Sequence, residues 1–503
     1  MSATTAFISA FREDSVTSSV LNSDEFDEFN SRRLRYAMYA AGYENTSYRN
    51  IHTWAQGRRV RYGLGKYIRD IHNPTAQLVD FHVSTIWRGS IAPLLVGGAI
   101  PLVVGGSNEE PVRKAADNLL RISNFETGKN ITVMKGCNLG DVGLKIVDDT
   151  ERGQVRVEVV DPSEIEETVT ENGIVKAYRL TKWQDNDSGI LTKYTEACER
   201  GDNEDVIFRT YINDRQVEWP GMEDSEWVEG YGFIPLVTIQ HRNVGRQWGW
   251  AEAHPVIGKF MEMDDIASML DDYIRKSVNA PALMSGMAKP NAKLTTTTSD
   301  ATEDNPQPGR EENKFIWAGD GVNATYTPMI ANMSIAEVDA RIQSIMASIE
   351  SDMPELRKSI WDIGGDPSGV ALATAREPTE TKINSRRTNY DGGLVRAMQM
   401  GIAIGGYRGY AGFEGFDLQS YGRGLLDISI AARPVFSEQK NEKIANENTF
   451  WTTWSQVAAT GTVPFETFAR RYGWTDEMLK EFGTQKAAAI MLEQEDTIPT
   501  EGL

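Results

Sequence analysis

The residues of this chain that are best able to do chemistry are five histidines and two cysteines. They are His52, His72, His82, His241, His254, Cys137 and Cys198. No two histidines have the i, i+4 spacing with an intervening Glu that zinc hydrolases use, and no cysteine cluster accompanies them. Because a site needs several such residues together and isolated histidines are common, we interpret these as surface or core-edge histidines. The sequence therefore predicts no catalytic residue, no metal site and no cofactor.

Two motifs of nucleotide and ester hydrolysis are also missing. The Gly-Lys pairs at 65–66, 128–129 and 258–259 are followed by Tyr67, Asn130 and Phe260. A phosphate-binding P-loop needs GxxxxGK followed by Ser or Thr, so that backbone amides hold the phosphates and the hydroxyl reaches magnesium. The chain has no GxSxG motif for a serine nucleophile either. ATP hydrolysis and serine-hydrolase chemistry are therefore not expected.

Adjacent acidic residues offer one remaining route to catalysis. Such pairs occur at Asp148-Asp149, Asp264-Asp265 and Asp271-Asp272, and the chain has 12 Trp. Paired carboxylates hydrolyse glycosidic bonds, so a carbohydrate-active hydrolase stays open as an alternative. Adjacent residues on a helix point in different directions, however, which favours solvated helix faces as the explanation of these pairs.

Length and charge narrow the class of protein further. The chain has 503 residues, of which 40% are hydrophobic, and 52 Lys and Arg against 72 Asp and Glu give a net charge of −20. A chain of this length is expected to form more than one structural unit. Its acidity argues against a protein that grips nucleic acid over its whole surface, but not against one that lets nucleic acid pass. With two cysteines, no signal-peptide core and no apolar run of ~20 residues, we expect a soluble protein in a reducing cytoplasm.

The elements that would position these residues follow from hydrophobic periodicity. We expect helices over 23–42 and 111–122. A third helix should start at Pro74, with Leu78, Phe81, Thr85 and Ile86 on one side. A fourth should start at Glu126, with Ile131, Met134 and Cys137 facing inward. Between 143 and 240 the period changes to two, and Asn172-Gly173 is a hairpin signal, which predicts a mainly antiparallel sheet.

Two long helices are expected to enclose a segment rich in Pro and Thr. The first has Val256, Phe260, Met263, Ala267, Leu270, Ile274 and Val278 at helical spacing, with acids on its other faces. The second begins with a capping box, Ser334-x-x-Glu337, and carries an apolar stripe from Ile335 to Met353. A loop with Gly364-Gly365 follows, then a helix that Pro378 should kink or break, and a C-terminal array of short helices with Phe450, Trp451, Trp454 and Val457 at core spacing.

A basic cluster interleaved with aromatic residues lies near the start of the chain. Its arginines include Arg32, Arg33, Arg35, Arg58, Arg59 and Arg61. Arginines among aromatics are typical of nucleic-acid platforms, but they are also enriched at protein interfaces. In an acidic chain we favour a subunit interface, with acidic segments of a neighbouring copy as the complement.

This order of parts resembles the portal proteins of tailed double-stranded DNA bacteriophages. The segments most similar to the family are Gly232-Phe-Ile-Pro-Leu-Val-Thr-Ile-Gln240, Met263-Asp-Asp-Ile-Ala-Ser-Met-Leu-Asp-Asp272 and Ser368-Gly-Val-Ala-Leu372. The resemblance implies an α+β fold in the following parts. They are an N-terminal arm (1–23), a wing (24–253, with 370–433 returning), a first stem helix (254–278), an α/β clip (279–333), a second stem helix (334–357), a tunnel loop (358–369), and a helical crown with a C-terminal tail (434–503).

The resemblance also implies a function without enzymatic chemistry. Portal proteins form rings, usually dodecamers, at one capsid vertex of the virion, where DNA passes during packaging and ejection; they assemble in the host cytoplasm. The expected partners are double-stranded DNA, the terminase large subunit, a head-tail adaptor protein, the major capsid protein and scaffolding protein, with no membrane. Another phage structural component, such as a scaffold or adaptor, stays open as an alternative.

Particular residues follow as expectations for such a ring. The tunnel loop would place Ile360, Trp361, Asp362, Ile363, Gly364, Gly365 and Asp366 near DNA, and Asp264, Asp265, Asp271 and Asp272 would include channel-facing residues of the stem. Lys289, Lys293 and Arg310 of the clip would contact the adaptor or terminase. Because cationic walls bind DNA strongly by releasing counterions, a channel through which DNA moves should present few Lys and Arg.

Overall fold

The computed structural model describes most of the chain between residues 28 and 483. The described residues are 28–46, 72–91, 99–105, 109–171, 174–185, 191–201, 203, 205–219, 224–278, 282–285, 315–318, 325–328, 334–357, 369–422, 425–436, 450–459, 464–471, 479 and 482–483. They fall into two units: 1–367 with 372–435, and 368–371 with 436–503. Among the described residues no helix is both long and apolar enough to cross a membrane.

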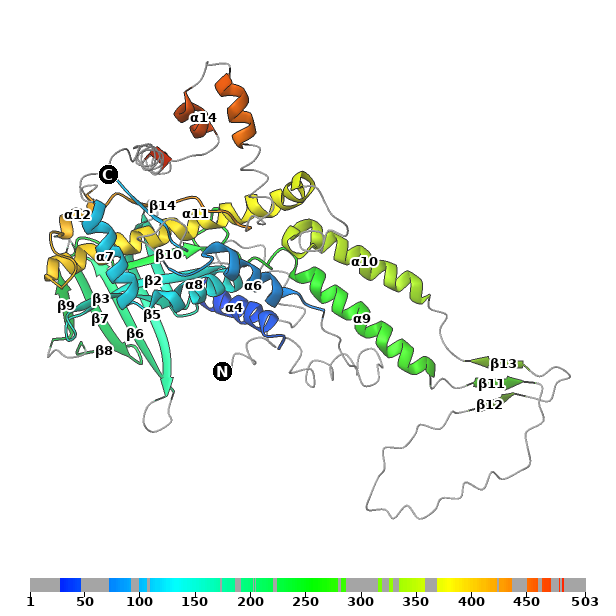
Figure 1. Cartoon of the computed structure of the whole chain (residues 1–503). Coiled ribbons are helices and arrows are strands. Elements are labelled where there is room, and N and C mark those ends of the chain that lie inside the picture. Colours follow the sequence, from blue (N-terminus) through cyan, green and yellow to red (C-terminus); the bar gives the residue numbers. More distant parts are fainter. Residues whose placement is uncertain are drawn as a thin grey trace, which may run out of the picture. The chain divides into compact units, whose positions relative to one another are not determined.

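The first helices among the described residues of the first unit are α4 (Phe29–Tyr43), α6 (Thr75–Ile86), α7 (Glu109–Ile122) and α8 (Phe125–Leu139) (Figure 1). The predicted inward face of α6 is confirmed, because Leu78, Phe81, Thr85 and Ile86 are all buried. Helix α6 begins directly after Pro74, whose fixed φ suits a helix start.

The inward face predicted for α8 is wrong in part. Ile131 is exposed, whereas Thr132, Val133 and Gly136 are buried together with Cys137. Gly136 lies so close to Tyr390 that a Cβ atom added there would be 2.1 Å from the phenol oxygen. Close approach of another helix therefore selects small residues on this face, and hydropathy alone does not reveal them.

The segment from 141 to 240 forms the antiparallel sheets predicted from its period of two. A three-stranded sheet has the order β10-β2-β3, from β10 (Leu236–Gln240), β2 (Asp141–Asp149) and β3 (Gln154–Val160). A six-stranded sheet has the order β4-β5-β6-β7-β8, with β9 also paired to β7. Its strands are β4 (Ile165–Glu171), β5 (Ile174–Asp185), β6 (Leu191–Arg200), β7 (Val206–Ile212), β8 (Arg215–Val217) and β9 (Glu226–Glu229). The pairing of Glu171 with Ile174 confirms the predicted hairpin.

The main hydrophobic core lies between the three-stranded sheet and the helices. Helices α7 and α8 pack on β2 and β3, and the core continues into α11 (Gly369–Arg408) through Tyr390, Leu394, Ala397 and Met398. Helix α11 runs through Pro378 rather than ending there. A short sheet of β1 (Leu102–Val104) and β14 (Ile428–Ile430), together with α12 (Leu418–Gly422), completes this part.

The two predicted long helices are α9 (Ile257–Val278) and α10 (Ile335–Asp352) (Figure 1). One half of the predicted capping box is confirmed at α10, where the Ser334 side chain accepts a hydrogen bond from the Glu337 amide. Between the helices in sequence lies a three-stranded sheet of β11 (Ala282–Ser285), β12 (Phe315–Ala318) and β13 (Thr325–Pro328), ordered β12-β11-β13. A 3₁₀ turn, η1 (Pro354–Leu356), follows α10.

The second unit contains a helix over 450–459 and α14 (Phe465–Arg471). Phe450, Phe468 and Ala469 form its core, with Trp454 and Val457 packed against them. Trp451, predicted at core spacing, is instead largely exposed and stacks on Phe465. The described parts of both units thus form an α+β fold.

Two glycines of α11 allow a test of its packing. A Cβ atom at Gly406 would lie 2.3 Å from the backbone oxygen of Phe416, whereas Gly392 has no such neighbour within 4 Å. Because a backbone oxygen cannot move aside, we expect Gly406→Ala to lower the free energy of unfolding by about 1–3 kcal/mol. Gly392→Ala should raise it by about 0.5–1 kcal/mol through helix propensity. Chemical denaturation measures both, and equal effects would contradict this packing.

Candidate functional site

The antiparallel pair of helices α9 and α10 is held together by apolar contacts near the start of α9. Phe260 and Met263 of α9 pack with Ile345 and Ile349 of α10, and Leu78 of α6 joins the same cluster. On the surface, Lys259 binds Asp352 at 2.6 Å and Arg341 binds Glu262 at 2.7 Å. The apolar stripes read from the sequence therefore face each other in this part of the pair.

Farther from this contact the same stripes are exposed. Ile274 of α9 is 41% exposed, and Ile335 at the start of α10 is 50% exposed. These two residues define what we call the distal apolar face of the pair. Contiguous exposed apolar surface typically marks a site that another molecule covers.

The remaining surface of α10 is small, polar and acidic. Its exposed residues include Ala336, Glu337, Asp339, Ala340, Gln343, Ser344, Ala347, Ser348, Ser351 and Asp352. Arg341 is the one basic residue in the helix, and its charge is matched by Glu262. The outer face of α10 therefore has no unpaired positive charge that a polyanion could bind.

The four acids proposed for a channel wall do not occupy equivalent positions. Asp264 is 1% exposed and accepts a hydrogen bond from the His72 amide at 2.7 Å, so it does not lie on the surface of the chain. Asp265 and Asp271 are half-buried, and the side chain of Asp272 lies outside the described residues. The expectation of a channel-facing carboxylate is therefore wrong for Asp264, because an adjacent segment needs that group as a hydrogen-bond acceptor.

Arg32 also differs from its predicted role. Its side chain is 1% exposed, donates hydrogen bonds to the carbonyls of Ile165 and Glu166, and stacks over Trp248 at 3.6 Å. It therefore joins α4 to the sheet of its own chain and is not available to a neighbour. Arg33, by contrast, is exposed.

The other residues proposed from the sequence are placed as follows. Arg35 is half-buried, with its guanidinium near the Tyr36 ring. Arg58, Arg59, Arg61, the loop residues 360–366, and Lys289, Lys293 and Arg310 lie outside the described residues. Their roles stay predictions.

The acid pair Asp148-Asp149 does not have the surroundings of a catalytic dyad. Asp148 is almost fully buried and bonds to Arg408 at 2.7 Å, to the Tyr231 hydroxyl at 2.6 Å and to the Tyr410 hydroxyl at 2.8 Å. Asp149 pairs with Arg156. Both carboxylates therefore join elements of the fold, and neither is free to protonate a substrate.

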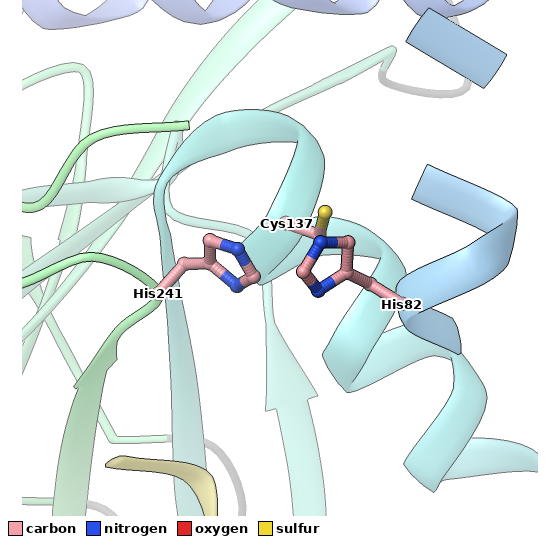
Figure 2. A group of neighbouring side chains, drawn as sticks. All are labelled: His82, Cys137 and His241. Atoms are coloured by element: carbon pink, nitrogen blue, oxygen red, sulfur yellow. The ribbon is translucent and has the colours of Figure 1, made fainter. Parts of the chain in front are cut away.

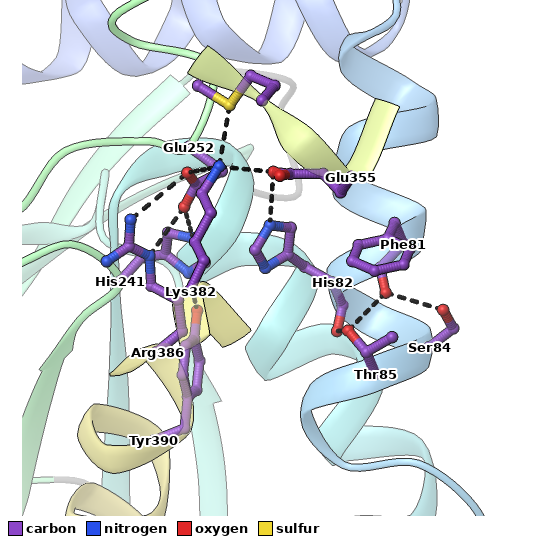
Figure 3. A network of polar contacts seen from close by, with 11 residues as sticks. Phe81, His82, Ser84, Thr85, His241, Glu252, Glu355, Lys382, Arg386 and Tyr390 are labelled. Atoms are coloured by element: carbon purple, nitrogen blue, oxygen red, sulfur yellow. Dashed lines mark hydrogen bonds and ion pairs between the residues drawn. The ribbon is translucent and has the colours of Figure 1, made fainter. Parts of the chain in front are cut away.

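A cluster of buried charged residues lies beside the α9–α10 pair, and sequence reasoning missed it. The buried charge cluster consists of His82, His241, Glu252, Glu355, Lys382 and Arg386 (Figure 3). His82 comes from α6, and His241 follows β10. Glu252 precedes α9, Glu355 lies in η1 directly after α10, and Lys382 and Arg386 are on α11. Five separate parts of the chain thus meet at six side chains.

Lys382 holds the centre of the cluster. Its ammonium binds Glu252 at 2.8 Å and Glu355 at 2.7 Å, and both carboxylates are fully buried. Arg386 and the Nε2 atom of His241 bind the other oxygen of Glu252, at 2.9 and 2.7 Å. The ring of His82 lies 3.4 Å from Glu355.

The protonation states of the cluster follow from burial and from these contacts. Burial lowers the pKa of His241 to about 4, against the effect of Glu252, so the ring is neutral at pH 7. Burial alone would raise the pKa of Glu252, but the His241 hydrogen bond and the Lys382 charge outweigh it and hold that pKa well below its usual range. A neutral His241 that donates from Nε2 to Glu252 accepts the Tyr390 hydroxyl hydrogen at Nδ1, 2.9 Å away. Lys382 and Arg386 bring two positive charges to the two carboxylates.

Two groups in this region have residue types that bind metals. One ligand atom each of His82, Cys137 and His241 lies within 4.8 Å of the others (Figure 2), as do those of His82, Glu252 and Glu355. Lys382 already provides the positive charge between the two carboxylates. Burial also raises the pKa of the Cys137 thiol well above its usual value, which disfavours the thiolate that a metal needs. The residues present therefore fit an ion-pair network better than a metal centre.

The sequence contains a partial signal for this cluster. His82 lies four residues after Leu78 and four before Ile86, on the inward stripe predicted for α6, yet it was interpreted as a surface or core-edge residue. That interpretation is wrong for His82 and His241, which are both fully buried. It holds for His72, which is exposed, and His254, which is half-buried; His52 lies outside the described residues.

Comparisons with known proteins give structural similarity but no family. No family model matches the sequence, and no curated protein matches it. Among solved structures, a chain from the neck of an empty GTA (gene transfer agent) particle computed with C6 symmetry is 11% identical. That match covers 80% of this chain and 90% of the other, with a TM-score of 0.45.

Two further structures of gene transfer agent particles are similar at the same level. A chain from the neck of a native particle computed with C12 symmetry is 12% identical, covers 80% and 89% of the two chains, and has a TM-score of 0.43. A chain from the virion of a native particle is 10% identical, covers 80% and 89%, and has a TM-score of 0.37. Similarity at this level does not by itself assign a function to the chain.

The low pKa of His241 predicts a pH dependence of stability. Between about pH 6.5 and pH 4 the unfolded chain binds a proton at this histidine and the folded chain does not, so acid favours unfolding. We expect the free energy of unfolding of the native chain to fall by up to about 3 kcal/mol more over this range than that of His241→Gln. Denaturation at several pH values measures the difference.

Titratable groups that do not contact His241 cancel in this comparison. One of them is Asp141, whose pKa burial raises to about 6 and which therefore acts in the opposite direction. Parallel curves for the native chain and His241→Gln would show that His241 is not held neutral.

Proposed function

We propose that this chain is a portal protein, which forms a ring at one capsid vertex and conducts double-stranded DNA during packaging and ejection. The observation that carries the proposal is the α9–α10 pair, which combines a distal apolar face with an outer surface that lacks unmatched cations. Neighbouring copies would cover the apolar face, and α10 would face the channel. The ring assembles in the host cytoplasm and becomes part of the virion.

The charge of the surface suits DNA that moves rather than DNA that is held. Lysines and arginines on a channel wall would displace counterions from the phosphates and bind the duplex tightly. Apart from Ile335 and the paired Arg341, the exposed residues of α10 are acidic, polar or small, and the whole chain carries a net charge of −20. A ring of such helices would bind DNA only weakly as the DNA moves through the channel.

The other parts take roles in line with this arrangement. The strands β11, β12 and β13 connect α9 to α10 and belong to the clip (279–333), where Lys289, Lys293 and Arg310 would contact the terminase large subunit and later the head-tail adaptor. The tunnel loop (358–369) would reach DNA beside α10. Exposed Arg33, with Arg58, Arg59 and Arg61, would bind acidic segments of a neighbouring copy, and the outer parts of the ring would meet the major capsid and scaffolding proteins.

Ring formation tests the proposal directly. The purified chain should have a solution mass that is a multiple of 56.0 kDa, near twelve copies, and negative-stain images should show a central hole. We expect Ile274→Lys combined with Ile335→Lys to abolish the ring without unfolding the chain, because both side chains are exposed in the single chain.

Val169→Lys is the matched control, because Val169 is 49% exposed but lies on β4, away from the pair. It should leave the ring intact. A monomeric native chain, or rings that persist with both isoleucines replaced, would contradict the proposal.

A further inference from the structure

The two cations of the α9–α10 pair whose side chains are described each bind an acid of the opposite helix. Arg341 of α10 lies 2.7 Å from Glu262 of α9, and Lys259 of α9 lies 2.6 Å from Asp352 of α10. The Lys259 ammonium also donates a hydrogen bond to the Ser348 hydroxyl at 2.8 Å. Both positive charges are therefore neutralised by the neighbouring helix.

These ion pairs are not what joins the two helices. The side chains of Arg341 and Glu262 are 58% and 51% exposed, and ion pairs in contact with water contribute little to stability. The apolar contact of Phe260 and Met263 with α10 already holds the helices together. The main effect of the Arg341–Glu262 pair is therefore on the charge of the surface.

An unpaired Arg341 would change that surface considerably. It is the one basic residue of α10, and among the described residues Glu262 is its one ion-pair partner. Without Glu262, each copy in a ring would present one free guanidinium at the same height. Phosphates that bind such cations release counterions, which makes DNA binding tight.

From these contacts we propose that Glu262 neutralises Arg341 so that α10 does not hold the phosphates of passing DNA, and that Asp352 does the same for Lys259. A phosphate that approaches Arg341 must displace the Glu262 carboxylate and is repelled by it. This inference rests on the proposed function, because it applies where α10 lines a channel for DNA.

Binding of a short linear DNA duplex to the purified full chain tests the inference. We expect Glu262→Gln to bind the duplex about tenfold or more tightly than the native chain at low salt, with a difference that shrinks as salt rises. Glu337→Gln is the matched control, because Glu337 is an exposed acid of α10 that pairs with no cation among the described residues. Equal binding by the two variants would overturn the inference.

Two further variants identify the cation responsible. The double variant Glu262→Gln with Arg341→Gln should bind DNA as weakly as the native chain. Asp352→Asn should also strengthen binding, but less, because the Ser348 hydroxyl still holds the Lys259 ammonium. If the double variant bound as tightly as Glu262→Gln, Arg341 would not be the group that Glu262 neutralises.

Covalently closed circular DNA shows whether the effect lies in the channel. A circle has no end that can enter a closed ring, so Glu262→Gln should bind it no more tightly than the native chain does. Equal gains for linear and circular DNA would place Arg341 outside the channel and overturn the inference. The solution mass separates the two proposals: a native chain without rings contradicts the proposed function, whereas intact rings with unchanged binding by Glu262→Gln refute this inference alone.

Discussion

Buried charges need partners, and in this fold those partners hold separate elements of the chain together. Glu252 and Glu355 are both fully buried, and a carboxylate in that position is tolerated only with cations and hydrogen-bond donors around it. Those partners come from α6, from the residue after β10 and from α11. Because one acid precedes α9 and the other follows α10, meeting this requirement also fixes the base of the long helix pair to the rest of the first unit.

The two ends of the helix pair differ in how completely their apolar side chains are covered. Near the charge cluster the apolar side chains of α9 and α10 face each other and Leu78, so this end is stable in a single chain. Toward the distal end Ile274 and Ile335 are exposed, and under the proposed function neighbouring copies would cover them. A protein that must assemble into a ring around a passing polymer would require both a fixed base and an incomplete surface.

Local patterns in the sequence predicted local structure well. The inward stripe of α6, the N-cap Ser334 of α10 and the hairpin that pairs Glu171 with Ile174 each depend on residues near one another in the chain, and each is confirmed. The portal resemblance predicted an α+β fold, which the described residues show. The positions of the clip and loop residues stay predictions.

Residues whose environment depends on distant partners could not be placed in this way. Asp264 was expected near a channel and Arg32 at a subunit interface, yet each binds a backbone group far away in sequence. The buried face of α8 depends on Gly136, which is small because Tyr390 of another helix occupies the adjacent space. His82 lay on a predicted inward stripe, but its partner Glu355 is 273 residues away, and no pattern along the chain connects them.

The most direct measurement of the central claim is a reconstruction of the assembled particle from electron micrographs of the purified full chain. The account predicts a closed ring in which α10 lines a central channel through Glu337, Asp339, Gln343 and Ala347, while Ile274 and Ile335 are buried between neighbouring copies. A ring in which the α9–α10 pair lies on the outer surface, or in which the distal apolar face remains exposed to solvent, would contradict it.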